Sequence, residues 1–152
     1  MYIVKYPDQF DINHVYLCEP IKNNIMNNGS FIRIIYSNNN VSLNGINLLL
    51  TLDGVAVERF YTKYRCFFDI IQHKELIDKI KMIEENVLKM SHIYNKIPQF
   101  NVYDQLNIGY IKIFSNQSTN ENMDTNLFML KIAGIWETET NYGVTYKFSK
   151  IS

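Results

Sequence analysis

The chain has 152 residues, the size of one domain, and 47% of them are hydrophobic, so it can bury a core without disulfide or metal. Fifteen Lys and Arg balance fifteen Asp and Glu, which excludes a uniformly basic nucleic-acid-binding surface but not a local basic stripe. Two cysteines are too few for a secreted disulfide scaffold. The sequence has no membrane-length apolar run and no signal-peptide pattern, so we expect an intracellular protein with no membrane partner.

The first half of the chain predicts an irregular extension followed by strands. Residues 1–30 contain turn-forming Pro, Gly and Asn, and we expect them to pack on a domain formed by residues 31–152. A short strand is expected around His14–Leu17. Three further strands are rich in β-branched and aromatic residues, and Asn44-Gly45 is expected to bulge the second. These strands are Phe31–Ser37, Val41–Leu52 and Val57–Asp69.

Helical periodicity then replaces the strand pattern between His73 and Ser91. Its apolar stripe consists of Leu76, Ile77, Ile80, Ile83, Val87 and Leu88. The adjacent Glu84 and Glu85 are expected on the solvated side of this helix. A polar segment at 115–126 predicts an exposed, mobile loop. The remaining strands are expected at Asn107–Ser115, Leu127–Trp136 and Gly143–Ile151, with the last two paired as an antiparallel hairpin.

The predicted order is therefore β-β-β-α-β-β-β. This order indicates a mainly β fold with one long helix in a single domain. A meander of three strands followed by a helix and further strands is typical of an OB-like Greek-key barrel. We take that barrel as the expected fold.

Alternation along the third predicted strand places basic and aromatic side chains on one face. The opposite face, which includes Phe60 and Cys66, is expected to turn toward the core. The fourth predicted strand repeats the basic and aromatic alternation, and Arg33 of the first strand adds a further cation. The candidate binding residues are Arg33, Arg59, Tyr61, Lys63, Arg65, Phe67, Tyr110, Lys112 and Phe114.

Cations interleaved with aromatic rings match the chemistry of a single nucleic-acid strand. The cations contact phosphates, and each ring that stacks on an unpaired base contributes roughly 1–3 kcal/mol. Single-stranded DNA is the expected ligand, with RNA as the alternative nucleic acid. Two other interpretations stay open, since the N-terminal extension could cover this face or it could be a protein interface, where Tyr and Arg are enriched.

No pattern in the sequence predicts catalysis, a metal or a cofactor. His14, His73 and His92 lack metal-ligand spacing, so surface or helix-end positions are expected for them. No nucleophile elbow or phosphate-binding glycine loop occurs. Cys66 is expected to be a small buried hydrophobe. The single tryptophan, Trp136, is expected either in the core beside the helix or as an exposed stacking platform.

Two segments carry a resemblance to a known group of proteins. They are ERFYTKYRCFFDI, which precedes the helix, and LKIAGIWETETNYGVTYKF near the end of the chain, with the step Tyr142-Gly143-Val144. Over roughly residues 31–151 the chain resembles small proteins of nucleocytoplasmic large DNA viruses that are grouped with phage-type single-stranded DNA-binding proteins. The resemblance implies an OB-fold and no catalysis or cofactor. It supports Tyr61, Lys63, Arg65, Phe67 and Lys112 as groove residues.

The expected function is sequence-tolerant, non-catalytic binding of single-stranded DNA in viral replication or recombination. Viral replication proteins and further copies of the chain are the expected protein partners. The host cytoplasm, the viral factory and the virion are the expected locations. The alternative is a structural or interaction protein, such as a minor virion component or a host-factor binder. Salt separates the two, because nucleic-acid binding weakens steeply with ionic strength.

Overall fold

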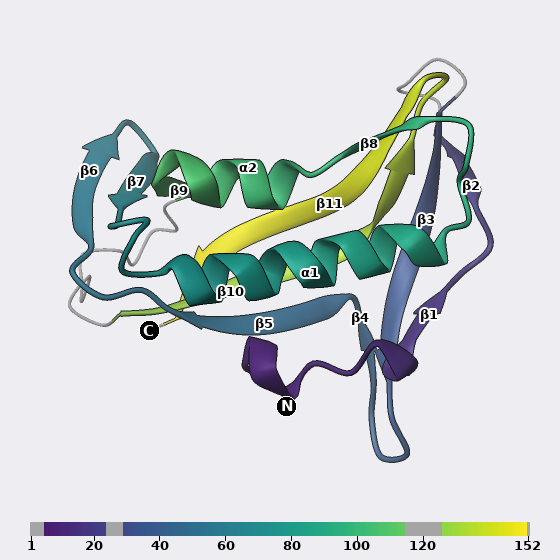
Figure 1. Ribbon diagram of the computed structural model, residues 1–152, viewed down its shortest axis with the longest axis horizontal. Helices are drawn as coiled ribbons and strands as arrows, with labels where there is room; N and C mark the ends of the chain where they lie inside the picture. The colour runs from purple at the N-terminus through teal and green to yellow at the C-terminus, as the bar shows by residue number, and fades with distance from the viewer. Residues whose placement is uncertain (1–4, 24–28, 115–125, 152) are drawn as a thin grey trace.

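The computed structural model describes residues 5–23, 29–114 and 126–151. Two sheets and two helices make up most of this part of the chain (Figure 1). The predicted mainly β fold with a long amphipathic helix is confirmed. The expectation of a single helix is wrong, because a second helix forms at Asn101–Ile108, where the sequence predicts no element before a strand that begins at Asn107.

A large, strongly curled sheet is centred on β10, the longest strand (Figure 1). One edge of β10 pairs antiparallel with β11, while its other edge pairs first with β5 and then with β3. The short strands β1, β2 and β4 add to β3, and β8 runs parallel to β11. The strands are β1 (Val15–Leu17), β2 (Ile21–Asn23), β3 (Gly29–Ser37), β4 (Ser42–Asn44), β5 (Ile46–Thr51), β8 (Ile97–Gln99), β10 (Leu127–Glu137) and β11 (Asn141–Lys150).

The N-terminal residues are more ordered than the sequence suggests. Two short 3-10 turns, η1 (Pro7–Gln9) and η2 (Ile12–His14), precede β1. The strand predicted around His14–Leu17 is present as β1, and β2 is a strand that was not expected. Both pair with β3, so this part of the chain belongs to the large sheet.

Gly45 lets the chain pass from one partner strand to another. It separates β4, which pairs with β3, from β5, which pairs with β10. Its φ is +85°, and a β-carbon there would lie 2.9 Å from the carbonyl oxygen of Ile132. Only glycine fits both conditions comfortably. The predicted bulge at Asn44-Gly45 is therefore a sharp break between two strands.

The predicted amphipathic helix is present as α1 (Lys74–Met90) and lies in front of β10 and β11 in Figure 1. Its apolar stripe is buried as expected, with Leu76 partly exposed. His73 occupies the N-cap position and is buried. Its Nε2 accepts a hydrogen bond from the Asp53 N–H at 2.9 Å, and its Nδ1 donates to the Asp69 carbonyl at 2.8 Å. These two partners fix the neutral tautomer that carries the proton on Nδ1.

The second helix, α2 (Asn101–Ile108), is joined to α1 by a buried carboxylate. Glu84 is 0% exposed, and its two oxygens accept the backbone N–H groups of Val102 and Tyr103. The expectation that Glu84 is solvated is therefore wrong, because it caps the first turn of α2. Gly109, with φ +98°, ends α2 in the left-handed conformation that favours glycine.

A separate three-stranded sheet consists of β6 (Ala56–Phe60), β7 (Lys63–Phe67) and β9 (Tyr110–Phe114). The single strand predicted over Val57–Asp69 is wrong, since Tyr61-Thr62 turns the chain back and β6 pairs with β7 as a hairpin. The strand predicted at Asn107–Ser115 is shorter, because residues 107 and 108 belong to α2. Residues 115–125 of the predicted loop lie outside the described residues.

The last predicted hairpin is confirmed, with β10 and β11 paired over most of their lengths. Phe128, Leu130 and Ile132 are buried, as alternation predicts. Val144 and Phe148 are also buried, whereas Tyr146 is half-buried. A register shift follows Ile132, and Gly134 resumes the pairing.

Candidate nucleic-acid interface

The outer face of the small sheet contains most of the candidate residues. Antiparallel pairing arranges it in three rows across β6, β7 and β9. Residues directly opposite one another share a face, so each row is a set of neighbours. The rows are Phe60–Lys63–Phe114, Glu58–Arg65–Lys112 and Ala56–Phe67–Tyr110. We call these nine residues the outer face.

Cations and rings alternate closely on the outer face. The Lys63 Nζ lies 5.4 Å from the centroid of the Phe114 ring. The Arg65 guanidinium carbon lies 5.7 Å from the ring centroids of both Phe60 and Tyr110. The Phe67 and Tyr110 rings are 5.3 Å apart between centroids. These distances fall within the range of cation–π and aromatic pairs, so the side chains support one another in an ordered surface.

The exposed fraction of the rings decides whether a ligand can reach them. Phe60 is 51% and Phe114 is 56% exposed, so each presents about half of its surface to solvent. Lys63 and Lys112 are exposed, while Arg65, Phe67 and Tyr110 are half-buried. The described residues of the N-terminal segment therefore leave rings and cations of the outer face accessible.

On β7 and β9, the opposite face of the small sheet is part of the core, whereas the β6 residues on that face are exposed. Tyr64, Cys66, Ile111 and Ile113 are buried there. Burial raises the pKa of the Cys66 thiol to about 11, and Lys150 opposes this only in part. The thiol is therefore protonated at neutral pH and is not a nucleophile, which agrees with the hydrophobic role expected from the sequence.

Three predicted site residues lie elsewhere. Arg59 pairs with Tyr64, so it is on the opposite face, with its guanidinium carbon 5.8 Å from the Tyr64 ring centroid. Tyr61 lies in the turn between β6 and β7 and is 82% exposed. Arg33 belongs to β3, which is at the other end of the molecule from the small sheet (Figure 1). The expectation that Arg59 and Tyr61 share one strand face with Lys63 and Arg65 is wrong, and Arg33 does not join the other candidates.

Three residues of the outer face, Ala56, Glu58 and Phe60, were not predicted. The hairpin turn shifts the alternation, so Phe60 changes from the expected core face to the outer face. The same shift places Glu58 beside Arg65. The length of the predicted strand is the feature of the sequence that could have indicated this turn. Thirteen residues from Val57 to Asp69 exceed the roughly 3–10 residues of ordinary strands, which favours a hidden turn.

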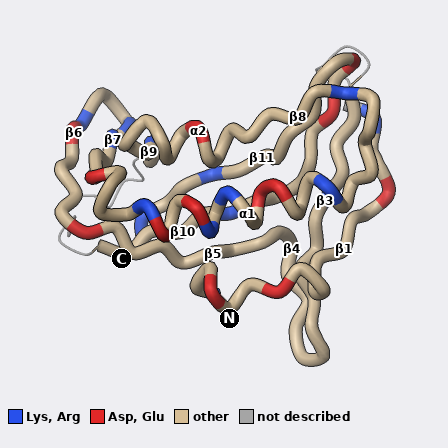
Figure 2. The backbone as a smooth tube through the Cα atoms, in the orientation of Figure 1, with Lys and Arg blue, Asp and Glu red and all other residues tan. Residues whose placement is uncertain are grey.

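Backbone positions of the charges are consistent with a local basic surface on a neutral chain. Figure 2 shows Lys and Arg positions on β6, β7 and β9, while both signs alternate along α1. The outer face has three cations, Lys63, Arg65 and Lys112, and one carboxylate, Glu58. It is therefore positive without requiring a positive net charge on the whole chain.

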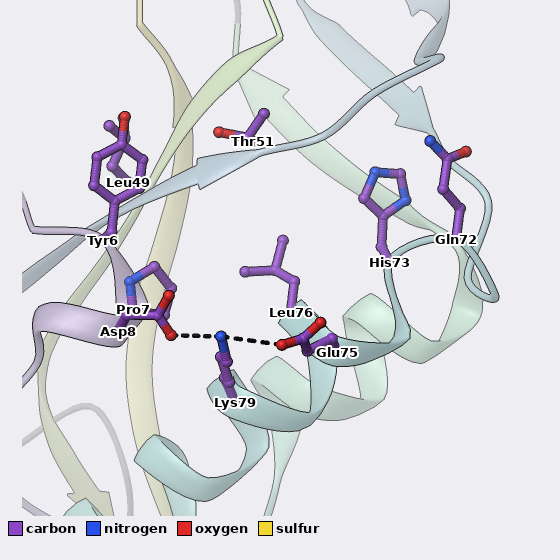
Figure 3. A pocket seen from close by; sticks show the side chains of 10 residues that line it. All are labelled: Tyr6, Pro7, Asp8, Leu49, Thr51, Gln72, His73, Glu75, Leu76 and Lys79. Carbon is purple, nitrogen blue, oxygen red and sulfur yellow. Dashed lines mark ion pairs between the residues drawn. The ribbon is translucent and has the colours of Figure 1, made fainter.

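A second candidate site is a pocket of about 330 Å³ between η1, β5 and the start of α1 (Figure 3). Leu49 and Leu76 form its apolar part, and Asp8, Lys79 and Glu75 form an ion-pair chain at its edge. The hydrogen bond to Asp8 is the main reason that the pKa of Lys79 is raised. His73 lines the pocket, but both its ring nitrogens have backbone partners. Among the described lining residues, the Asp8 and Glu75 carboxylates are paired with Lys79 and the His73 ring is fully hydrogen-bonded.

The other candidates from the sequence form no site. His14 contacts the edge of the Tyr36 ring, and His92 is exposed and hydrogen-bonds Tyr94. Trp136 is half-buried, and its ring covers Gly143, where a β-carbon would come within 2.8 Å of the indole. It thus packs on the large sheet away from the outer face.

Residues 5–23, 29–114 and 126–151 provide neither a metal-ligand cluster nor a membrane-length apolar helix. These residues contain no cluster of three or more His, Cys, Asp and Glu side chains that could hold a metal ion. None of their helices has the length and apolar character needed to cross a membrane. Comparison of the chain with protein-family models, with curated protein sequences and with solved structures gives no match.

Proposed function

We propose that the chain binds single-stranded DNA, with little sequence preference, on the outer face of the small sheet. The observation that carries the proposal is the combination of accessible rings and cations in adjacent rows. Lys63 and Lys112 are exposed, so phosphates can reach them, and Phe60 and Phe114 each expose about half of their surface for a base. Stacking on rings tolerates any base, because every base has a π-face.

The proposal also covers the fold of the chain and its role in the cell. An OB-like barrel is supported by the strong curl of the large sheet and by the position of α1 between β7 and β9 in the chain (Figure 1). The described strands form two separate sheets. The closure of these sheets into one barrel is therefore proposed, in addition to the mainly β fold. The viral resemblance adds an intracellular role in replication or recombination, with viral replication proteins or further copies of the chain as partners.

A fluorescence-anisotropy titration tests the function. The probe is labelled oligo-dT of about 30 nucleotides, long enough for the usual site sizes of such proteins. We expect micromolar or tighter binding at low salt that duplex DNA does not displace, because stacking needs unpaired bases. Three phosphate contacts predict a slope of about −2 for log affinity against log salt concentration. Absence of binding at low salt would refute the proposal.

Matched variants test whether the outer face is the surface that binds DNA. Alanine replacement of Lys63, Arg65 and Lys112 together should remove most of the affinity and most of the salt slope. The control replaces Lys22, Lys74 and Lys89, three exposed cations on β2 and α1, and removes the same charge. Glu58→Gln removes the carboxylate beside Arg65 and should strengthen binding. Equal losses in the two triple variants would contradict the assignment to the outer face.

A protein partner is the second candidate for the same face. It is favoured by Glu58 opposite Arg65, which lowers the positive charge, and by cations that already contact rings within the sheet. Arg and aromatic residues are also enriched in protein interfaces. A minor virion component or a host-factor binder would use the surface in this way. Binding that changes little between low and moderate salt would favour this candidate.

A further inference from the structure

The tip of the β6–β7 hairpin has an unusual surface for a tight turn. Phe60 pairs with Lys63, which leaves Tyr61 and Thr62 as the two turn residues. The Phe60 and Tyr61 rings meet edge to face, with centroids 4.6 Å apart. Tyr61 is 82% exposed. Two accessible aromatic rings therefore protrude together beside a lysine at the end of the small sheet.

The backbone of Tyr61 is unfavourable for its side chain. Its φ is 56°, a left-handed value that it shares among the described non-glycine residues only with His92. Two-residue hairpin turns with a positive φ at the first central position favour glycine there, because a β-carbon is strained in that conformation. Glycine at this position would make a better turn and would also remove an exposed ring. Neither the stability of the hairpin nor the solubility of the protein explains why a tyrosine occupies position 61.

We infer that Tyr61 is a ligand-contacting residue which stacks against a base of single-stranded DNA next to Phe60. This inference rests on the proposed function and extends the binding surface from the outer face to the hairpin tip. The charge and the exposed rings at the hairpin tip indicate a nucleic-acid ligand. Lys63 is adjacent to Phe60 across the hairpin, so a cation for a phosphate is close to the two rings. Strained residues occur preferentially at functional sites, where the strain is tolerated because the residue is used.

Three substitutions at position 61 test the inference. Tyr61→Phe keeps the ring and should bind oligo-dT like the wild type. Tyr61→Gly and Tyr61→Ala remove the ring and should weaken binding about fivefold or more, the loss of one base stack. Tyr61→Gly should leave the thermal midpoint unchanged or slightly raised, because it relieves the turn. A clear fall in its midpoint would contradict the strain that the inference starts from.

A spectroscopic readout separates stacking from a general loss of affinity. Oligonucleotides containing 2-aminopurine should lose fluorescence when saturated with wild type or Tyr61→Phe. The quenching should be smaller with Tyr61→Gly at equal saturation. Tyr94→Ala is the matched control, since Tyr94 is 84% exposed and lies in the segment between α1 and β8. It should change neither affinity nor quenching.

The outcomes distinguish this inference from the proposed function. A wild-type chain that binds no oligo-dT at low salt refutes both. A wild-type chain that binds, with Tyr61→Gly equal to it in affinity and quenching, refutes the role of Tyr61 and leaves the outer face as the binding surface. Weakened binding with full quenching also overturns the inference, because the quenching base would then stack elsewhere.

Discussion

The Glu84 side chain in α1 accepts a hydrogen bond from the backbone N–H of Tyr103 in α2, with an Oε1···N distance of 2.9 Å. Its other oxygen accepts the Val102 N–H at 3.0 Å. These are N–H groups of the first turn of α2, which have no partner within their own helix. One residue of α1 therefore performs the capping that α2 lacks locally, since Phe100 at the N-cap position provides no side-chain hydrogen bond.

Removal of this cap should destabilise the protein. Glu84→Ala leaves two backbone donors and a small cavity in a buried site, so we expect a loss of about 2 kcal/mol or more in the free energy of unfolding. Glu84→Gln retains one acceptor oxygen and should lose less. Urea unfolding followed by circular dichroism measures both, and Glu85→Ala, on the adjacent and more exposed residue, is the control. An unchanged midpoint for Glu84→Ala would contradict the capping role.

The same carboxyl predicts an unusual pH dependence. Burial raises the pKa of Glu84, and the two backbone N–H groups lower it only in part. The folded state therefore holds this proton more tightly than the unfolded state, whose pKa is about 4.3. The contribution of Glu84 to stability is greatest below that value and declines as pH rises through the folded pKa. Compared with Glu84→Gln, the wild type should gain stability as the pH falls from neutral toward about 4.5. A constant difference between them would count against the raised pKa.

Glu137 should behave in the opposite way. Its Oε2 lies 2.7 Å from the Lys96 Nζ, and its Oε1 accepts the Ser30 hydroxyl at 2.9 Å. The hydrogen bond from Lys96 is the main reason that the pKa of Glu137 is lowered, with a smaller effect from Ser30. Its contribution is present above the unfolded pKa of about 4.3 and is lost as pH falls through the folded pKa.

The Glu137→Gln variant measures this contribution. It should unfold about 1 kcal/mol more easily than the wild type at neutral pH, because the pair with Lys96 is mostly shielded from solvent. The difference should shrink as the pH falls below the unfolded pKa of about 4.3. Glu139→Gln, an exposed position in the same turn, is the control. A difference that grows in acid would show that the sign of the pKa shift is wrong.

These two carboxylates illustrate what the sequence could and could not predict. The helix α1 and the hairpin of β10 and β11 follow from local periodicity, because apolar spacing along one segment determines its buried face. The role of Glu84 depends on α2, which arrives from later in the chain. A polar residue beside an apolar stripe looks the same in a sequence whether solvent or a helix terminus covers it.

The prediction of the outer face was limited in the same way, because it depended on a turn that the sequence pattern does not mark. Alternation correctly groups Lys63, Arg65 and Phe67, and separately Tyr110, Lys112 and Phe114, on shared faces. Pairing of β7 with β9 unites the two sets. Tyr61-Thr62 contains none of the residues that usually mark a hairpin turn, so the reversal is invisible to composition and shifts Arg59 to the other face.

The reactivity of Cys66 provides a test of the small sheet in solution. Its side chain is 0% exposed, and burial raises its pKa to about 11. In a Cys18→Ser background, which leaves Cys66 as the only thiol, we expect no reaction with a thiol reagent such as dithionitrobenzoate at pH 8. Complete reaction should follow in urea. Rapid labelling of the folded protein would show that the small sheet opens or packs differently.

Substitution of the two arginines in the β6–β7 hairpin distinguishes the effect of side-chain position from the effect of charge. Arg65 is on the outer face beside Phe60 and Tyr110, whereas Arg59 is on the opposite face above Tyr64. If the outer face binds single-stranded DNA, Arg65→Ala should weaken oligo-dT binding severalfold and reduce the salt slope by about 0.7, the value for one phosphate contact on a single strand. Arg59→Ala removes the same charge a few residues away and should change both quantities much less. Equal effects would mean that the ligand responds to the charge of the whole hairpin and not to the arrangement of side chains on one face.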